Sequence, residues 1–304
     1  MGLSRSNSAP LSYSFCMHAF FLLWYCGLLV TFVSGGNNET DQLALLEFKA
    51  KITSDPFGVM SSWNNNIHFC QWRGITRGHR HQMVTMLDLK SLKLVGSISS
   101  SVGNLSFLKS LTLQNNSFHN EIPLEIGRLH RLQVLRLQNN TINGKIPISL
   151  ASCTNLNFLQ VSYNLLTGEI PSNLGTLSKL RFFAIPQNNV TGSIPNSFGN
   201  MSSLEVFSAF FNQLGGSILD SFGQLTKLTV FNMGSNKLSG TIPPSFFNLS
   251  SMIDFNVGGN RIQGHLPLDI GITLPNIHFF SIIENQFTGY IPASITNASN
   301  LYLL

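Results

Sequence analysis

The stretch LQVLRLQNNTINGKIP (residues 132–147) sets a frame of apolar residues, asparagine, glycine and proline that returns along most of the chain. Its second asparagine recurs every 24 residues, and once after 25, at positions 116, 140, 164, 188, 212, 236, 260 and 285. A fixed period of roughly 20–29 residues is typical of a solenoid, in which each unit buries its apolar face against its neighbours. Nine full units fit between Val84 and Thr296, and a tenth begins at Leu301.

The positions within each unit predict an α/β solenoid with one parallel sheet. Leu135 and Leu137 are expected to point inward from a short strand and Arg136 outward, because strand side chains alternate between faces. The repeated asparagine is expected to turn inward, where its amide can bond backbone groups that the bend leaves unpaired. The Ile-Pro pair predicts an extended flank. The predicted strands of this sheet lie at Leu111–Leu113, Leu135–Leu137, Leu159–Val161 and the equivalent positions.

The composition narrows the range of partners. Only 10% of the residues are charged and 43% are apolar, which is too apolar for a disordered chain. The net charge is +5, and the basic residues are scattered, with no run that could follow a phosphate backbone. Nucleic acid is therefore not an expected partner.

Residues 1–35 predict a secretory signal peptide. Arg5 gives a positive start, residues 19–33 are apolar, and Val33-Ser34-Gly35 offers small residues for cleavage. The apolar stretch is shorter than the roughly 20 residues that a membrane-spanning helix needs. An uncleaved anchor is the alternative. Cleavage would leave Cys70 and Cys153 as the two cysteines of the mature chain. The mature chain is expected in the secretory pathway.

Residues 36–83 are expected to cap the apolar end of the solenoid. Residues 40–52 carry apolar side chains at positions 43, 45, 46 and 48, which predicts a helix that Thr40 or Asp41 could cap. Asp55-Pro56 is expected to end this helix.

Cys153 is predicted to be a buried free cysteine, because it occupies an otherwise apolar column of the repeat. About three units, or roughly 14 Å of strand stacking, separate it from Cys70, whereas bridged Cα atoms lie within about 7 Å. No disulfide between them is expected. The other members of the column are Leu105, Leu129, Leu177, Met201, Leu225 and Leu249.

The sequence resembles the ectodomains of plant leucine-rich-repeat receptor kinases, a group that includes defence receptors. The resemblance rests on GEIP, GSIP and GTIP turns in 24-residue units, behind a cap that contains LLEFKAKITSDP, SSWN and CQWRGI, and it covers residues 40–304. It implies a plant-type horseshoe or superhelix with the parallel sheet on its concave face and a helical N-terminal cap. In that family a membrane helix and a cytoplasmic Ser/Thr kinase follow the repeats; residues 1–304 contain neither, so we expect a truncated ectodomain.

The family's cap motif is Cys-x-Trp-x-Gly-Val-x-Cys with its two cysteines bridged. This chain keeps Cys70, Trp72, Gly74 and Ile75, but Arg77 stands where the second cysteine is expected. Cys70 is therefore predicted to be unpaired and open to mispairing. Two turns also depart from the family pattern, with Leu219 in place of proline and Asn120 in place of glycine.

Ligand binding is expected on the outward side of the sheet, because solenoids present an extended concave surface. An apolar strip edged by hydrogen-bonding groups suits an extended peptide. The alternative is that its aromatic rings pack on one another as part of the sheet face. The candidate residues are Arg136, Gln138, Phe158, Gln160, Phe182, Phe210, Phe211 and Asn232.

Eight Asn-x-Ser/Thr sequons are candidate glycosylation sites. Asn104, Asn200, Asn248 and Asn297 share one place in the repeat, so their glycans would form a stripe along the convex side. The other four are Asn38, Asn115, Asn139 and Asn189.

No enzyme, metal site or cofactor is expected. His79-Arg80-His81 lacks the thiolates or carboxylates that would complete a metal site, and a solvated loop is the simpler interpretation. No phosphate-binding loop, nucleophile elbow or HExxH motif occurs. The predicted function is recognition of a peptide or protein ligand, with a possible co-receptor ectodomain, at the outer side of the plasma membrane. A secreted binding protein of the polygalacturonase-inhibitor type and a non-functional gene fragment are the alternatives.

Overall fold

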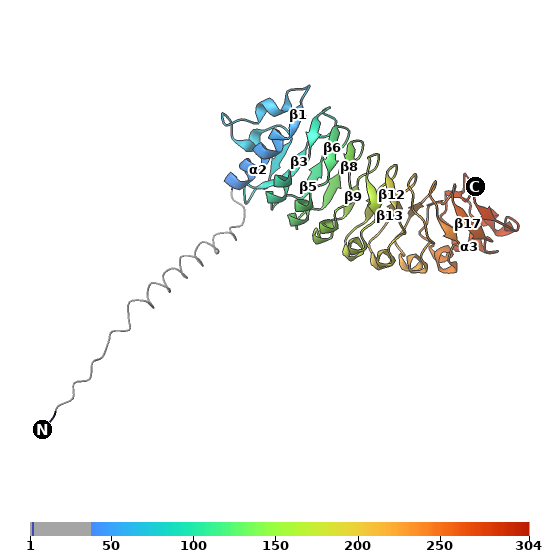
Figure 1. Cartoon of the computed structure of the whole chain (residues 1–304). Coiled ribbons are helices and arrows are strands. Elements are labelled where there is room, and N and C mark those ends of the chain that lie inside the picture. The colour runs from blue at the N-terminus through green and yellow to red at the C-terminus, as the bar shows by residue number, and fades with distance from the viewer. Residues whose placement is uncertain (1, 3–37, 304) are drawn as a thin grey trace.

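The repeated strands pair side by side into one sheet that runs the length of the repeats (Figure 1). The computed structural model describes residue 2 and residues 38–303, so the predicted signal peptide lies outside the described residues except for Gly2. Strands β3 to β18 of this sheet are parallel, and β2 pairs antiparallel with β3. In order, they are β2 (Ile75–Arg77), β3 (Val84–Asp88), β5 (Ser110–Thr112), β7 (Val134–Arg136), β9 (Phe158–Gln160), β11 (Phe182–Ala184), β13 (Val206–Ser208), β14 (Val230–Asn232), β16 (Asp254–Asn256) and β18 (Phe279–Ser281).

The predicted parallel sheet is confirmed, although its strands begin and end one residue earlier than predicted. Leu113, the second inward residue of its unit, still donates its backbone N–H to Arg136 O at 2.8 Å. It lies just outside β5 because the chain bends there toward the repeated asparagine. The inward and outward sides are as predicted, since Leu135 and Leu137 are buried and Arg136 between them is half-buried.

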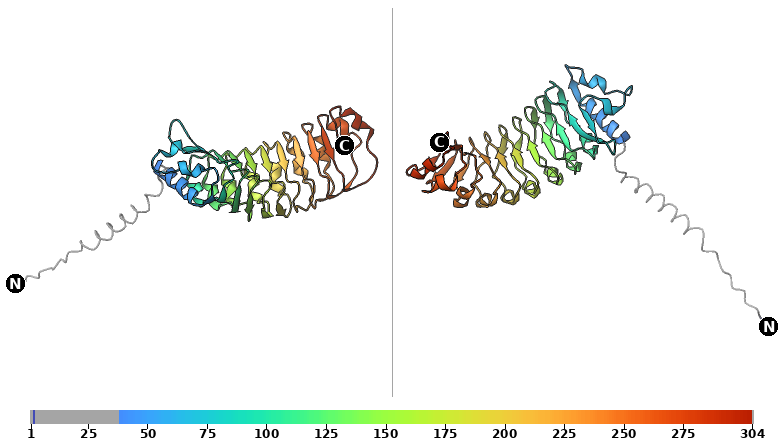
Figure 2. Two further views of the ribbon diagram at one scale, coloured as in Figure 1. Left: turned by 90° about the horizontal axis from the view of Figure 1, so that it is seen from above. Right: turned by 180° about the vertical axis from the view of Figure 1, so that it is seen from behind.

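Short strands and turns complete each unit, and Figure 2 shows the curved stack from two further directions. The flank strands are β1 (Ile52–Ser54), β4 (Val95–Ser97), β6 (Ser117–Glu121), β8 (Thr141–Asn143), β10 (Thr167–Glu169), β12 (Asn189–Thr191), β15 (Ser239–Gly240), β17 (Arg261–Gly264) and β19 (Gln286–Phe287). The convex side is built from the 3₁₀ turns η3 (Ser100–Asn104), η4 (Leu124–Arg128), η5 (Ile148–Ser152), η6 (Ser172–Thr176), η7 (Asn196–Asn200), η8 (Asp220–Gln224), η9 (Pro244–Asn248) and η10 (Ala293–Asn297), with helix α3 (Ile270–Thr273) between η9 and η10.

The repeated asparagines form a ladder of hydrogen bonds between units. Asn188 is buried, and its Nδ2 donates to Val161 O at 3.1 Å, Ile185 O at 3.0 Å and Pro186 O at 3.2 Å. Its Oδ1 accepts the N–H of Leu166 at 2.9 Å. One amide therefore satisfies backbone groups of its own unit and of the unit before it, as the sequence predicted.

The inward side chains change from leucine to phenylalanine along the sheet. Leu87, Leu111, Leu135 and Leu159 fill this column in the first four units. In the next five units, rings stack on one another with centroids 5.1–5.9 Å apart. We call these rings the phenylalanine column; they are Phe183, Phe207, Phe231, Phe255 and Phe280.

The two departures from the family turn pattern leave the backbone unchanged. Asn120 adopts the left-handed conformation, with φ of 64°, that Gly144 adopts in the next unit with φ of 74°. Asparagine tolerates this region better than most residues other than glycine. Leu219 precedes η8 with φ −79° and ψ 136°, close to the −65° and 136° of Pro195 before η7.

The 25-residue unit has its extra residue on the convex side. Leu274 N bonds to Ile270 O at 3.0 Å, so α3 closes an α-helical turn where the other units have a 3₁₀ turn. The unit before it carries Phe247 in a column that is glycine in most units. A pocket of about 400 Å³ opens between the two units, lined by Phe247, Asp269 and Thr273 among others.

The cap packs one side of helix α2 (Asn38–Ala50) against the first repeats. Leu45 and Phe48 are fully buried, and Leu43 is exposed. The predicted helix end at Asp55-Pro56 is wrong, because the chain leaves the helix at Ala50 to pair β1 with β4. The cap also contains the 3₁₀ turns η1 (Val59–Ser62) and η2 (Phe69–Gln71).

The predicted capping role of Asp41 is also wrong. The helix already begins at Asn38, and the Asp41 side chain is buried and accepts the backbone N–H of Val84 at 2.7 Å through Oδ2. Its Oδ1 has no hydrogen-bond partner. Burial raises the pKa of Asp41 to about 6, against a smaller lowering by the bond from Val84. The carboxyl thus connects the cap helix to the first repeat strand.

We expect the stability of the domain to fall as the pH rises through the titration of Asp41. Because its pKa is raised from 3.8 to about 6 on folding, the folded state binds more protons, and the contribution is lost between these values. From pH 5 to pH 7 the loss should be about 1 kcal/mol. Urea unfolding of wild type and Asp41→Asn at both pH values measures it. Equal pH dependence in the two proteins would contradict this assignment.

Cys70 and Cys153 both carry free thiols in the structure. Cys153 is buried, and its Sγ–H donates to Ile126 O at 3.3 Å; burial raises the pKa of this thiol to about 12. Cys70 is half-buried, and the guanidinium of Arg77, at the position of the missing cysteine, donates to Gln82 Oε1. Burial raises the pKa of Cys70, and the Arg77 charge opposes this shift. The raised pKa reduces the thiolate fraction, and with it the reactivity expected of this thiol.

The cap holds its core without a disulfide. Trp72 is buried and stacks on Trp63 with ring centroids 5.4 Å apart and an interplanar angle of 16°. Trp72 Nε1 donates to Asn64 O at 3.2 Å, and Trp63 Nε1 donates to Arg73 O at 3.0 Å. The indole pair therefore fixes the loop that the missing bridge would close.

Arg77→Cys should form a bridge with Cys70 and raise the melting temperature and the secreted yield. The two positions are seven residues apart, and a bridge that closes a loop of this length contributes about 2 kcal/mol by chain-entropy arguments. The measurements are thermal unfolding with and without reductant, and yield from a secreting host. Arg77→Ser removes the arginine without supplying a thiol. If the two variants melt and secrete alike, the stacked tryptophans alone hold the cap.

Candidate ligand-binding surface

Three of the predicted residues form a stack on the concave face. Arg136, Phe158 and Phe182 project from β7, β9 and β11, which are neighbours in the sheet. The guanidinium carbon of Arg136 lies 4.5 Å from the centroid of the Phe158 ring. The Phe158 and Phe182 rings are parallel to within 7°, with centroids 4.2 Å apart. Packing of the rings on one another, which the sequence left as the alternative, is therefore real, and all three side chains remain partly exposed.

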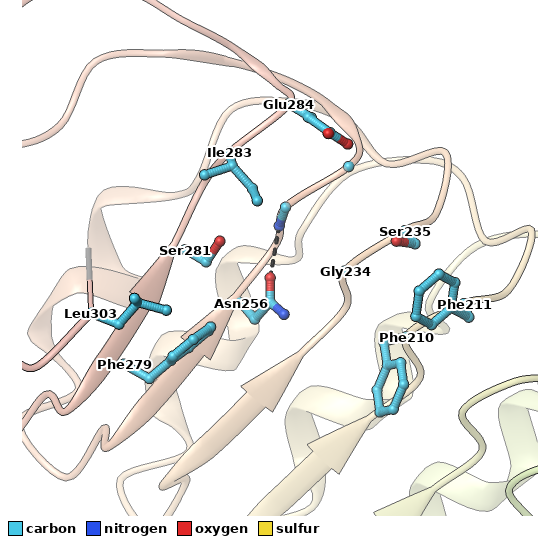
Figure 3. A pocket seen from close by; sticks show the side chains of 12 residues that line it. Phe210, Phe211, Gly234, Ser235, Asn256, Phe279, Ser281, Ile283, Glu284 and Leu303 are labelled. Atoms are coloured by element: carbon cyan, nitrogen blue, oxygen red, sulfur yellow. Dashed lines mark hydrogen bonds between the residues drawn. The ribbon is translucent and has the colours of Figure 1, made fainter.

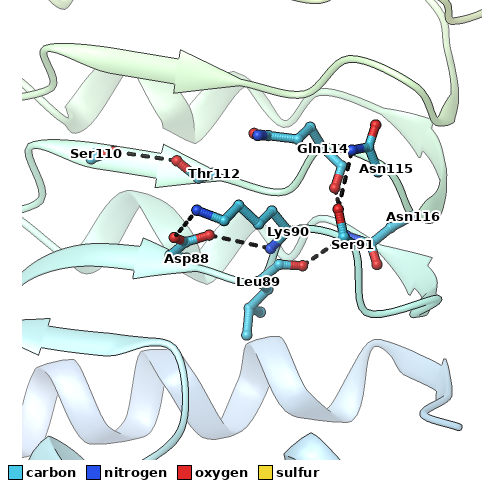
Figure 4. A network of polar contacts seen from close by, with 9 residues as sticks. All are labelled: Asp88, Leu89, Lys90, Ser91, Ser110, Thr112, Gln114, Asn115 and Asn116. Carbon is cyan, nitrogen blue, oxygen red and sulfur yellow. Dashed lines mark hydrogen bonds and ion pairs between the residues drawn. The ribbon is translucent and has the colours of Figure 1, made fainter. Parts of the chain in front are cut away.

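Two glutamines beside this stack have unused hydrogen-bonding capacity. Gln138, which the sequence predicted, and Gln114 of the preceding unit each bury an Oε1 atom that has no partner. Figure 4 shows Gln114 beside Ser91, whose backbone N–H donates to Gln114 O at 2.9 Å and whose hydroxyl accepts from Asn115 Nδ2 at 3.1 Å. A buried acceptor without a donor is unfavourable by about 1–3 kcal/mol. A ligand N–H would remove that penalty.

Phe210 and Phe211 belong to a second feature further along the face, a pocket of about 390 Å³ (Figure 3). The pocket is hollow because Gly234 and Gly258 stand in the outward column that holds Gln114, Gln138, Ser162, Pro186 and Phe210 in earlier units. Its remaining lining residues are Ser235, Asn256, Gly259, Phe279, Ser281, Ile283, Glu284 and Leu303. Five of the eight predicted residues therefore lie in two features of the face, three in the stack and two in the pocket.

The polar residues of this second feature are partly used within the chain. The Oδ1 of Asn232 accepts the N–H of Gly234 at 3.3 Å, and that of Asn256 accepts the N–H of Gly258 at 2.9 Å. These short turns fix the floor of the pocket. Asn232, predicted as a ligand contact, thus shapes the backbone beside the pocket. Gln160 is half-buried on β9, and its side chain makes no hydrogen bond to another described residue.

Two exposed aromatic residues occupy strained backbone positions. The residue before each ladder asparagine is left-handed, and in two units it is Tyr163, with φ of 54°, or Phe211, with φ of 52°. Their exposed fractions are 44% and 55%. Large side chains are uncommon in this region, and here the turn of the repeat imposes the conformation in every unit.

Sequence reasoning did not select Tyr163, Phe279 or Ile283. Phe279 and Ile283 lie in outward columns whose members vary, and an apolar residue there carries no distinct signal. Two successive glycines, Gly234 and Gly258, in a column of larger residues are the signal that could have indicated a hollow.

The concave face changes its charge along the sheet. Arg136 and Lys90 lie in the first units, whereas Asp254 of β16 and Glu284 beside the pocket lie in the later ones. Among the described residues, Arg136 and Glu284 have no ion-pair partner, since the ion pairs are those of Lys90 with Asp88 and Arg181 with Glu205. Because Asp88 neutralises Lys90, the described surface offers one unpaired cation, Arg136, in its first units and the carboxylates of Asp254 and Glu284 in its later ones.

Seven of the eight sequon asparagines have exposed side chains, and the side chain of Asn38, in α2, is outside the described part. Asn104, Asn200, Asn248 and Asn297 end the convex turns η3, η7, η9 and η10, away from the sheet face. The other exposed ones are Asn115, Asn139 and Asn189.

Within residues 38–303 no three His, Cys, Asp or Glu side chains gather to hold a metal ion, and no described helix is long and apolar enough to cross a membrane.

Family models match both parts of the described chain. The leucine-rich-repeat N-terminal domain matches residues 38–76, and the leucine-rich repeat matches residues 107–129, 131–153, 155–177 and 227–249. A probable leucine-rich-repeat receptor-like serine/threonine-protein kinase of Arabidopsis thaliana is 45% identical over 102 residues, which are 34% of this chain and 10% of the relative.

Two solved structures have the same fold over most of the chain. The ectodomain of the receptor kinase GASSHO1/SCHENGEN3 from Arabidopsis thaliana, in complex with CASPARIAN STRIP INTEGRITY FACTOR 2, superposes with a TM-score of 0.83 at 31% identity; the match covers 87% of this chain and 32% of that one. The Arabidopsis receptor kinase HAESA, in complex with the peptide hormone IDA and the co-receptor SERK1, gives 0.78 at 32% identity, covering 86% and 44%.

This chain thus spans less than half of each of these relatives. The plant-type solenoid with a parallel sheet and a helical cap, predicted from the sequence, is confirmed by the sheet topology and by these structures. The chain has the plant-type leucine-rich-repeat fold, and its cap and repeats are similar to those of plant receptor-like kinase ectodomains.

Proposed function

We propose that the concave face binds an extended peptide. The observation that carries this proposal is the stack of Arg136, Phe158 and Phe182, which offers partly exposed rings and an unpaired cation on three adjacent strands. The free acceptors of Gln114 and Gln138 supply partners for main-chain N–H groups at the edge of the same stack. The pocket between Phe210 and Ile283 would hold an apolar side chain further along the peptide.

The similarity to ligand-bound ectodomains supports this function. HAESA is seen with a peptide hormone and a co-receptor, and its fold matches 86% of this chain. We propose accordingly that residues 36–83 and 84–304 form the cap and the repeats of a receptor-kinase ectodomain that faces the cell exterior. In this proposal residues 1–35 direct secretion, the convex sequons carry glycans, and a co-receptor ectodomain is a second partner. The catalytic kinase of such a receptor would lie outside these 304 residues.

The experiment uses peptides recovered from plant extracellular fluid. The secreted protein is immobilised, bound peptides are identified by mass spectrometry, and each is resynthesised and titrated against the protein by calorimetry. A peptide that binds the protein in solution and protects β7, β9 and β11 from hydrogen exchange supports the proposal. Protection confined to the convex turns would contradict it. Sequencing the transcript beyond residue 304 separates a receptor kinase from a secreted inhibitor and from a gene fragment.

A further inference from the structure

A cationic pocket lies at the rim of the sheet, where the cap meets the first repeats. Its volume is about 240 Å³, which corresponds to roughly eight water molecules. The loop between β2 and β3 forms one wall, and the starts of the second and third repeat strands form the other. The lining residues are Gly78, His79, Arg80, His81, Met83, Thr85, Phe107, Lys109 and Arg131, with no carboxylate among them.

The pocket is organised around the Phe107 ring. The guanidinium carbon of Arg131 lies 3.9 Å from the ring centroid, and the His81 ring centroid lies 5.4 Å away. Stacking on an aromatic face orients a guanidinium while leaving its N–H groups free to donate. The cation is therefore held in place although it lies at the surface.

The cations of this pocket lack the partners that similar cations have elsewhere on the same rim. In the fifth unit, Lys179 donates to Asn155 Oδ1 at 2.6 Å, and Arg181 pairs with Glu205 through two hydrogen bonds of 2.7 and 2.8 Å. Within residues 38–303, neither Arg80, Lys109 nor Arg131 forms an ion pair. Three unpaired cations around one hollow repel one another, and an anion between them would relieve that repulsion.

We propose that this pocket is a binding site for an oxyanion, a carboxylate, sulfate or phosphate group carried by a small ligand or a side chain. Arg131 and Lys109 supply the principal charge, Arg80 closes the site from the cap loop, and the ring nitrogens of His79 and His81 add polar contacts. Planar guanidinium groups bind such anions through paired N–H donors. The site is separate from the concave stack, and it stands whether or not the concave face binds peptide.

The test is calorimetric titration of the purified secreted protein with sodium pyrophosphate, sulfate and citrate, each at constant ionic strength against chloride. Wild type should bind at least one of them, and the preferred anion identifies the group. The double variant Lys109→Gln/Arg131→Gln should bind at least tenfold more weakly. Lys227→Gln/Lys237→Gln is the matched control, because it also removes two exposed cations and Lys227 occupies the same rim position as Arg131 four units away; its affinity should stay within about twofold of wild type.

The proposal is overturned if wild type binds none of the three anions up to about 10 mM, a limit set by the millimolar affinity of weak sites. It is also overturned if the control loses as much affinity as the double variant, because binding would then follow net charge alone. Melting in chloride buffer verifies that the variants fold. If the double variant melts early, Lys109→Gln alone, whose side chain is exposed, should still weaken binding several-fold.

Discussion

Replacing both Phe158 and Phe182 by Asp should abolish binding of the peptide ligand and leave secretion intact. The change removes two aromatic rings from the centre of the proposed contact with the peptide. Truncation of central aromatic residues often weakens binding by about 2 kcal/mol or more. The two new carboxylates also repel each other on adjacent strands. Folding should tolerate the change, because both side chains project from the concave face and are only half-buried. The stacked pair contributes only about 0.5–1.5 kcal/mol.

The control for this experiment is the double change Leu124→Asp/Ile148→Asp. These exposed apolar residues lie one repeat apart in the convex turns η4 and η5, so two charges are added on adjacent units away from the concave face. Calorimetric titration with the resynthesised peptide and the amount of protein in the medium are the two measurements. Full binding by the phenylalanine variant together with loss in the Leu124/Ile148 variant would place the ligand on the convex side, against our proposal.

Replacing Asn188 by Leu should destabilise the domain by about 3–5 kcal/mol and sharply reduce its secretion. Leucine has a similar volume but no polar atoms. The change leaves the N–H of Leu166 and the C=O of Val161 without the bonds of 2.9 and 3.1 Å that Asn188 supplies in a buried place. Each buried polar group left unpaired is unfavourable by about 1–3 kcal/mol.

The comparison is with Asn173→Leu, the same chemical change at an exposed position of η6. Urea unfolding followed by circular dichroism should give nearly the wild-type midpoint for Asn173→Leu and a much lower one for Asn188→Leu. A loss below about 1 kcal/mol at Asn188 would mean that water or a backbone shift replaces the ladder bonds.

The repeat itself was readable from the sequence because its rules are local. The period of 24 residues places one residue inward and the next outward in every unit, as Leu135 and Arg136 show. An amide at the bend can only bond the backbone groups that the bend leaves unpaired, as Asn188 does. The reading of Asn120 as a replacement for glycine is explained in the same way, since its left-handed φ of 64° follows from the turn.

The sites depend on contacts that a repeat pattern does not encode. The sequence predicted that Asp41 caps a helix. Its hydrogen-bond partner, Val84, lies 43 residues away along the chain, so a local helix pattern could not indicate this bond. The cationic pocket needs the cap loop to fold back on Phe107 and Arg131. The pocket between Phe211 and Ile283 exists because Gly234 and Gly258 have no side chains to fill it. Period and composition place residues on a face, but they do not show which of them meet.

The phenylalanine column gives the solenoid a direction. A unit taken from the first four repeats carries leucine where the later units stack rings 5.1–5.9 Å apart, so moving it there would leave a gap on both sides. A later unit moved forward would bring a ring into space shaped for leucine. Recombination between copies of the repeat is therefore restricted to neighbours of the same core size. In this gene, units can be duplicated next to their origin more readily than they can be shuffled across the fifth repeat.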